Sequence, residues 1–258
     1  MPTSGGSSSN PLYSMINGGI EYFNDFMSEP LTGHLLDQKT AGTTDRSGVG
    51  LTNTGSTGFL GMTSFGARSV NGRISHDPIA LDYLASRVTQ TIEARVRMPA
   101  EVPDGTNNFV FRLGFTSSWA TNTHFEDASQ CAFVYNTLSG NTWLNGSNLQ
   151  PVATGSPNWQ IIGANSPAFA TNIAATTNAS IANEFQTLRV TATPLSYGSN
   201  TYNIEYFINN VSVRSYTLTM GATQVLRPGY AMNRIAGTAS RVAYIDYIYF
   251  RIDPLFTR

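Results

Sequence analysis

Alternating apolar and polar positions predict β-strands along much of this chain. In Val88–Met98 the apolar residues at every second position share one face, and the charged residues between them share the other. Such a period of two is typical of a strand with one buried face. Phe109–Phe115 has the same pattern, and the segment between the two contains the turn residues Pro103, Asp104 and Gly105. We therefore expect these two strands to form a hairpin.

A second hairpin is predicted in the last third of the chain. Tyr202–Ile208 and Val211–Leu218 both alternate, and only Asn209 and Asn210 separate them. Asparagine tolerates the positive φ angles of a type I′ turn, which matches the twist of two paired strands. Phe185–Thr193, just before this hairpin, alternates in the same way and is predicted to be another half-buried strand.

Other segments are predicted from their overall apolar character. Val242–Ile252 is apolar on both faces, which favours a central place in a sheet. Ile20–Met27 is predicted as an early strand, and Cys131–Asn136 as a short buried one. Pro78–Arg87 fits either one helical turn or an extended segment. Leu138–Asn183 is rich in Asn, Thr, Ser, Ala and Gly, and fits either decorated loops or short irregular strands.

These patterns together predict an all-β chain with one domain. No segment sustains the spacing of an amphipathic helix, and no linker divides the sequence. We therefore predict a single antiparallel two-sheet sandwich over residues 20–258. Residues 1–19 are rich in Gly and Ser and are predicted to form an extended N-terminal arm.

Charge and cysteine content exclude several classes of function. Only 12% of the 258 residues are charged, and 15 basic against 16 acidic residues give a net charge of −1. Nucleic-acid binding by charge needs a basic excess, which this chain lacks. Intrinsic disorder needs a high net charge with low hydrophobicity, and it is excluded because the net charge is near zero and 41% of the residues are hydrophobic. No apolar run is long enough to span a membrane.

Cys131 is the only cysteine and is predicted to be a small buried hydrophobe. The first ten residues lack a signal peptide's basic and apolar regions, so we expect the chain to fold in a host cytoplasm.

Short motifs mark the start, middle and end of the predicted strand order: Asn24–Phe26, Thr91–Val96, Arg112–Phe115, Phe185–Val190, Ile204–Val213 and Tyr244–Phe250. In this order they resemble the concanavalin A-like lectin/glucanase jelly roll. The resemblance implies two stacked antiparallel sheets, with the first and last strands close together. The fold hosts lectins, glycoside hydrolases, laminin-type modules and viral structural proteins.

The carboxylates do not follow the pattern of this family's glucanases. Those enzymes place two or three carboxylates at alternate positions of one strand, because hydrolysis needs an acid and a base or nucleophile on opposite sides of the glycosidic bond. None of the 16 acidic residues here has another acid two positions away. Carboxylates on different strands could still converge, but we predict no catalytic residues.

No metal or cofactor site is predicted either. The nearest cluster, Asn122, His124, Glu126 and Asp127, offers few of the oxygen ligands that calcium prefers, and we interpret it as a polar loop.

Tryptophans in the middle of the chain are the candidates for glycan binding. An aromatic ring stacks on the C–H face of a sugar, and amides bind its hydroxyls. Trp119, Trp143 and Trp159 lie in this region, and Asn145 is close to Trp143. The alternative is that these tryptophans pin long loops onto the core.

Two hypotheses for function follow from the sequence. The first is a non-enzymatic virion structural protein: a bacteriophage capsid decoration, head-fibre or tail-associated protein. It would form oligomers, attach to capsid or tail proteins through its arm and one sheet face, and expose loops to a surface glycan. Low charge lets many copies crowd on a particle. The second is a lectin or glycoside hydrolase of the same fold. The arm residues expected to make the attachment are Pro2, Ser4, Asn10, Pro11 and Tyr13.

Overall fold

In the part of the chain that the structure describes, the regular elements are β-strands. The structure is a computed structural model, and strands β1 to β17 account for nearly all of the part it describes. That part comprises residues 14–16, 19–24, 44–45, 60–64, 71–75, 87–98, 109–116, 130–136, 143–145, 148–150, 158–164, 172–179, 184–220, 227–234 and 241–255. Of the predicted arm, residues 1–19, positions 14–16 and 19 belong to strands, and the remaining positions lie outside these ranges, as does most of the segment 78–87.

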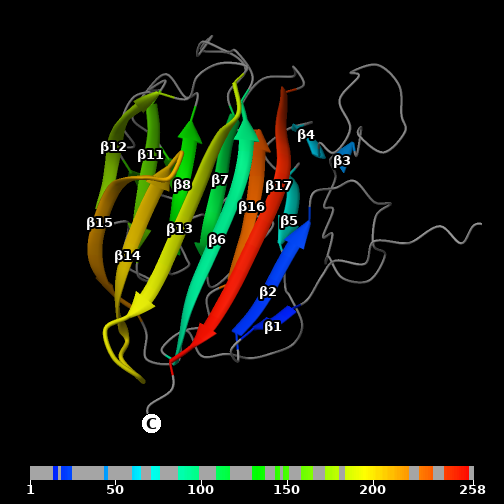
Figure 1. Ribbon diagram of the computed structural model, residues 1–258. Coiled ribbons are helices and arrows are strands. Elements are labelled where there is room, and N and C mark those ends of the chain that lie inside the picture. Colours follow the sequence, from blue (N-terminus) through cyan, green and yellow to red (C-terminus); the bar gives the residue numbers. More distant parts are fainter. Residues whose placement is uncertain are drawn as a thin grey trace, which may run out of the picture.

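The strands form two layers (Figure 1). The front sheet has the order β1 (Ser14–Ile16), β2 (Gly19–Asn24), β17 (Arg241–Pro254), β6 (Val88–Arg97), β13 (Gln186–Pro194), β14 (Thr201–Ile208) and β15 (Val211–Thr219). In the same sheet β4 (Leu60–Ser64) pairs with β17 and with β3 (Thr44–Asp45). The rear sheet has the order β12 (Asn172–Ala179), β11 (Asn158–Ala164), β8 (Gln130–Asn136), β7 (Phe109–Thr116), β16 (Arg227–Arg234) and β5 (Asn71–Ser75). A small ribbon pairs β9 (Trp143–Asn145) with β10 (Asn148–Gln150).

Every pairing among these strands is antiparallel, as predicted. The early strand β2 lies beside the final strand β17, so the two ends of the described chain meet in one sheet. β17 is central, with β6 on one side and β2 and β4 on the other. The apolar character of both its faces correctly predicted this place.

The predicted hairpin between Val88–Met98 and Phe109–Phe115 is wrong. β6 pairs with β13 and β17, whereas β7 pairs with β8 and β16 in the other sheet. Figure 1 shows β7 behind β6. Each strand has one wholly apolar face, and this pattern suits two strands that face each other across a core as well as two that pair side by side.

The second predicted hairpin is confirmed. β14 and β15 are paired, and Asn209 and Asn210 have φ angles of 50° and 65°. Two successive positive φ angles are those of a type I′ turn. The Asn209 side chain also accepts a hydrogen bond from the backbone N–H of Thr187, at 2.8 Å, which ties the turn to β13.

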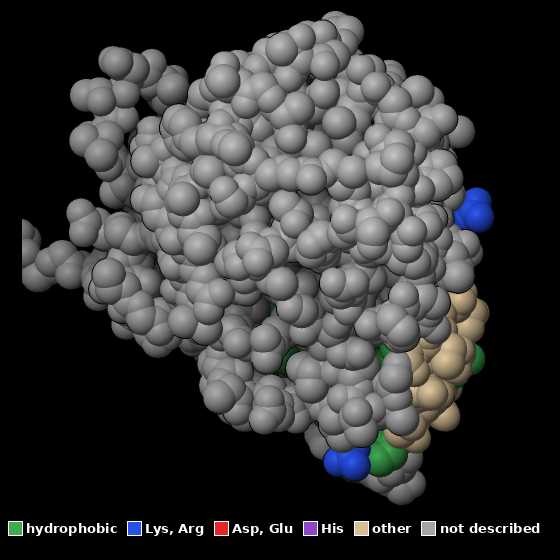
Figure 2. Space-filling view, turned by 180° about the vertical axis from the view of Figure 1, so that it is seen from behind, with side chains coloured by type: hydrophobic (Ala, Val, Ile, Leu, Met, Phe, Trp, Pro, Cys, Tyr) green, Lys and Arg blue, Asp and Glu red, His purple; other side chains and the backbone are tan. Residues whose placement is uncertain are grey.

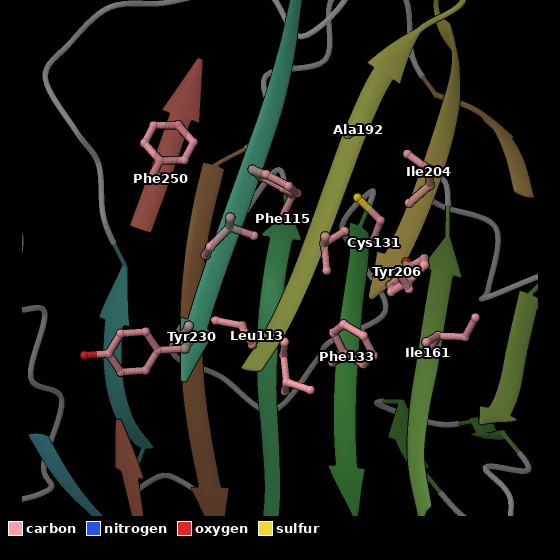
Figure 3. Close-up of a cluster of buried hydrophobic side chains, with 14 of the residues drawn as sticks. Leu113, Phe115, Cys131, Phe133, Ile161, Ala192, Ile204, Tyr206, Tyr230 and Phe250 are labelled. Atoms are coloured by element: carbon pink, nitrogen blue, oxygen red, sulfur yellow. The ribbon is translucent and has the colours of Figure 1, made fainter. Parts of the chain in front are cut away.

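Large aromatic side chains from both sheets fill the space between the layers. Trp159 lies edge-on to Phe111 and Phe133, with centroids 6.3 and 6.2 Å away, and Phe133 lies edge-on to Tyr206 of the opposite sheet at 5.2 Å. Edge-to-face contacts of this kind are favourable beyond the apolar area that they bury. Figure 3 shows Cys131 within this cluster, and its side chain is fully buried, as predicted.

The region 138–183 contains regular strands as well as connections. β11 is a seven-residue strand of the rear sheet that lies between the edge strand β12 and β8, and its residues Trp159 and Ile161 belong to the core. Of the two interpretations of this polar region, the structure supports strands for β9 to β12.

The outer side of the rear sheet is covered where the structure describes it. Arg112, Val134 and Gln160 point away from the core, yet their exposed fractions are only 4%, 1% and 1%. In the view from behind, the described side chains reach the surface mainly along the side of the molecule where β15 lies (Figure 2). The open sheet face in the described part is therefore the outer face of the front sheet.

Candidate functional site

The open face of the front sheet carries most of the described charged and exposed aromatic side chains. In β6, β13 and β14 buried and partly exposed positions alternate along the whole strand. The buried set belongs to the core, so every other residue of these strands points outward. The outward positions of β6 and β13 were predicted from the sequence, including Glu93, Arg189 and Thr191.

The register of the sheet aligns these outward residues in two rows that run across five strands. Residues directly opposite each other on paired strands have adjacent side chains. One row consists of Phe23, Tyr249, Glu93, Arg189 and Phe207, on β2, β17, β6, β13 and β14 respectively. The row beside it consists of Glu21, Arg251, Thr91, Thr191 and Glu205 on the same strands.

A groove lies over the middle of the second row. Thr91 and Thr191 are short, whereas the residues at both ends of their row are long, so the middle of the face is lower than its sides. The groove is open to solvent and has a volume of about 580 Å³. From Arg251 on β17 to Glu205 on β14 it crosses three strand spacings, roughly 14 Å. The groove is lined by the residues of both rows apart from Glu21, and by Tyr247 and Asp253 of β17.

One side of the groove is built around Glu93. Its carboxylate accepts a hydrogen bond of 2.8 Å from the Tyr247 hydroxyl and lies 3.5 Å from an Arg189 nitrogen. The Arg189 guanidinium lies over the Phe207 ring, 4.2 Å from its centroid, and donates to the Asn210 side chain at 3.2 Å. A cation over an aromatic face is stabilised by the ring quadrupole. These contacts fix both charged groups in place.

The other side is built around Arg251. Its Nε donates to both carboxylate oxygens of Asp253, at 2.7 and 2.8 Å, and its NH1 donates to Glu21 at 2.8 Å. The Tyr249 hydroxyl donates to the same Glu21 oxygen at 3.1 Å. Hydrogen bonds to Asp253 raise the pKa of Arg251 further above its already high value, so it remains a cation.

Burial and neighbouring carboxylates keep the groove tyrosines protonated. Desolvation raises the pKa of Tyr247 to about 12, and the negative Glu93 beside it adds to the shift. Desolvation, with smaller effects from its hydrogen-bonded neighbours, raises the pKa of Tyr249. Both phenols are therefore hydrogen-bond donors at neutral pH.

Glu205 differs from the other carboxylates of the groove. It makes no ion pair or hydrogen bond with any residue that the structure describes, although its side chain is partly buried. The residues opposite it, Thr191 and Ser215, and those beside it on its own strand, Asn203 and Phe207, are uncharged. The diagonal Arg189 is engaged by Glu93 and the Phe207 ring. Glu205 therefore presents an unpaired negative charge to the groove.

Of the residues predicted from the sequence for glycan binding, Trp159 is the one whose side chain the structure describes, and it does not line this groove. Trp159 is fully buried and its ring nitrogen donates to Gln186 at 2.9 Å, so it is a core residue and offers no face to a sugar. Its prediction as a sugar-stacking residue is therefore wrong, and the alternative that it anchors its segment to the core is correct. Trp143 and Asn145 lie on β9, of which only the backbone is described, and Trp119 lies outside the described residues.

The groove could not be predicted from the sequence, because its residues come from five strands that lie far apart in the chain. In the sequence, these residues share one feature: each occupies an outward position of a strand in which apolar and polar residues alternate. Placing β13 between β6 and β14 turns those positions into adjacent rows. Among the described residues no group of three or more His, Cys, Asp or Glu is arranged to hold a metal ion. Within the same residues no helix has the length and apolar character needed to span a membrane.

Comparisons with known proteins identify the fold. No family model and no curated protein matches the sequence. A protein of unknown function from Shewanella oneidensis is 12% identical with a TM-score of 0.56, covering 93% of this chain and 89% of that one. Peanut lectin is 10% identical with a TM-score of 0.53, covering 93% and 99%. An endo-1,3-beta-glucanase from Streptomyces sioyaensis is 15% identical with a TM-score of 0.50, covering 99% and 100%. At these identities the likeness concerns the fold alone, and the chain has the concanavalin A-like jelly roll of lectins and glucanases.

Proposed function

We propose that this chain binds a glycan in the groove on the outer face of its front sheet. The observation that carries the proposal is the groove itself, a low floor of two threonines between aromatic and charged side chains. Phe23, Phe207 and the two tyrosines offer apolar ring surface to sugar C–H groups. The carboxylates accept hydrogen bonds from sugar hydroxyls, and the hydroxyl groups of Tyr247 and Thr191 also make hydrogen bonds. A lectin and a glucanase share the fold, which is compatible with this proposal.

We also propose that the chain binds without hydrolysing its ligand. A glycosidase needs two carboxyl groups facing each other across the glycosidic bond. Glu93 and Glu205 are on strands separated by β13 and are offset along the strands by two residues. In addition, Glu93 is held by Tyr247 and Arg189, so it is engaged before any substrate arrives. These features favour recognition over catalysis.

A glycan array with purified protein tests whether the chain binds a glycan, and a pair of matched variants tests whether the glycan binds in the groove. Phe23 and Leu195 are both large exposed hydrophobic residues, 45% and 62% exposed, but only Phe23 lines the groove. Phe23→Ala is expected to weaken binding at least fivefold, and Leu195→Ala to leave it unchanged. Equal effects of the two variants, or an array with no ligand, contradict the proposal. Release of reducing ends from any bound glycan contradicts the non-enzymatic part.

The second candidate is a structural protein of a bacteriophage particle, whether a capsid decoration, head-fibre or tail-associated protein. The structural feature that favours it is β15, an edge strand of the front sheet with mostly exposed positions, among them Val211 at 63%. An uncovered edge strand can pair with another chain. In the view from behind, the described surface on this side is mostly backbone and uncharged polar side chains, with Lys or Arg groups above and below it (Figure 2).

Sedimentation at high protein concentration tests the assembly that this second candidate requires. Wild type is expected to form oligomers, and Val211→Lys, which adds a charge to the edge strand, to shift them toward monomer. A wild-type chain that remains monomeric at all concentrations counts against the virion role and leaves the groove proposal untouched.

A further inference from the structure

We propose that the groove selects glycans that carry a protonated amine, and that Glu205 is the residue that determines this specificity. The inference rests on the proposed function, since it concerns the ligand class of the same groove. It follows from the charge balance of the lining residues, the occupation of both arginines, and the isolation of Glu205.

The charge balance of the groove is negative. Among the described residues, its lining contains three carboxylates, those of Glu93, Glu205 and Asp253, against the guanidinium groups of Arg189 and Arg251. Glu21, which is bound to Arg251 at one edge, adds a fourth carboxylate. The described residues of the site therefore have a formal charge of −2, from four carboxylates and two guanidinium groups. Such a site repels uronic acids and sulfated sugars and attracts cations.

Both arginines are already occupied by partners within the protein. Arg251 makes hydrogen bonds with Asp253 and Glu21, and Arg189 contacts Glu93, Asn210 and the Phe207 ring. An acidic sugar would have to break one of these interactions to gain a counter-ion. Paired cations therefore make the groove a poor site for anionic glycans.

Glu205 is the carboxylate that remains for the ligand. The polar neighbours that could have satisfied it are bonded elsewhere: Thr191 lies 3.3 Å from Thr91 through their Oγ1 atoms, and Ser215 donates to Asn203 at 3.0 Å. A sugar ammonium next to Glu205 forms a charge-assisted hydrogen bond, which is shorter and stronger than a bond between neutral groups. At a partly exposed position we expect about a fivefold gain in affinity over the same sugar with its amine acetylated.

Calorimetry with paired ligands tests this inference. The probes are tetramers of glucosamine and of N-acetylglucosamine, titrated at pH 6, together with the amine-bearing, acetylated and uronate glycans of the array. The amine-bearing member of a pair is expected to bind about five times more tightly, and uronate glycans not to bind. In Glu205→Gln the affinity ratio between the members of a pair is expected to fall to about one. Glu184→Gln, at an exposed position outside the groove, is the matched control and is expected to keep the wild-type ratio.

The outcomes separate this inference from the proposed function. Neutral glycans that bind as tightly as their amine-bearing counterparts overturn the amine selectivity and leave glycan binding standing. The amine selectivity is likewise overturned if uronate glycans bind equally well, or if Glu205→Gln keeps the wild-type ratio. A chain that binds no glycan of any charge overturns both proposals.

Discussion

Thr91 and Thr191 face each other across the paired strands β6 and β13, with their Oγ1 atoms 3.3 Å apart. This pair is the floor of the groove, and it is low because threonine is short compared with the arginine and glutamate side chains at the two ends of its row. The depth of the site therefore depends on two small residues more than on any charged one.

Filling the floor is expected to abolish glycan binding without damage to the fold. Thr191→Tyr places a large ring over Thr91, and tyrosine is well suited to a strand, so the free energy of unfolding is expected to change by no more than about 1 kcal/mol. Glycan affinity is expected to fall more than tenfold, measured by calorimetry with the best ligand of the array. The matched control is Thr193→Tyr, on the same strand and face but outside the lining. Equal losses in both variants would place the ligand elsewhere.

The sequence predicted which residues face outward more successfully than which strands are neighbours. Alternation placed Glu93 on the outer side of its strand and Arg189 on the outer side of another, and both placements are confirmed. Their contact requires β6 and β13 to be paired in a register that aligns residues 96 positions apart. Periodicity reports the face of each strand separately and contains no information on that pairing.

The same limit explains the errors. A strand with one apolar face, such as β7, satisfies its pattern in either sheet, so its predicted pairing with β6 was wrong. Trp159 lies in a polar region of the sequence, which suggested an exposed residue, but its strand is paired on both sides, with β8 and β12, and its ring is buried in the core. In contrast, the turn at Asn209 and Asn210 was predictable because it is specified by two adjacent residues.

Gly163 is required by a tyrosine from the opposite sheet. A Cβ atom at this position of β11 would overlap the Tyr216 ring and hydroxyl, which come from β15. Gly163→Ala is therefore expected to lower the free energy of unfolding by about 1–3 kcal/mol, the usual cost of overpacking, measured by urea denaturation. In a Tyr216→Ala background the same substitution is expected to cost much less, because the space is then open. An equal cost in both backgrounds would show that the tyrosine is not the obstacle.

Two buried tyrosines on the same strand are expected to respond oppositely to loss of the hydroxyl. Tyr206 donates to the Ile162 carbonyl at 3.0 Å and lies 2.8 Å from the Tyr216 hydroxyl, so Tyr206→Phe is expected to destabilise the fold by about 1 kcal/mol. The Tyr202 hydroxyl is buried without a hydrogen-bond partner among the described residues. Tyr202→Phe removes that unsatisfied group and is expected to be neutral or to stabilise by up to about 1 kcal/mol. Urea denaturation of the two variants beside wild type measures both effects, and similar losses in the two would contradict the assignment.

Stability is expected to fall in alkaline solution through the buried tyrosines. Desolvation raises the pKa of Tyr202 from 10.0 to about 12, with a smaller contribution from Cys131. Because the folded state holds this proton more tightly than the unfolded state, the contribution is fully present below pH 10 and is lost as the pH rises through 12. The thiol of Cys131, whose pKa burial raises from 9.0, adds a decline that begins about one pH unit earlier. The midpoint of urea denaturation is expected to fall between pH 8 and pH 11. In Tyr202→Phe the decrease of the midpoint above pH 10 is expected to be smaller than in wild type. Tyr197→Phe, at an exposed position, serves as the control and should keep the wild-type slope. A midpoint that stays constant to pH 11 would mean that these groups titrate alike in the folded and unfolded chains.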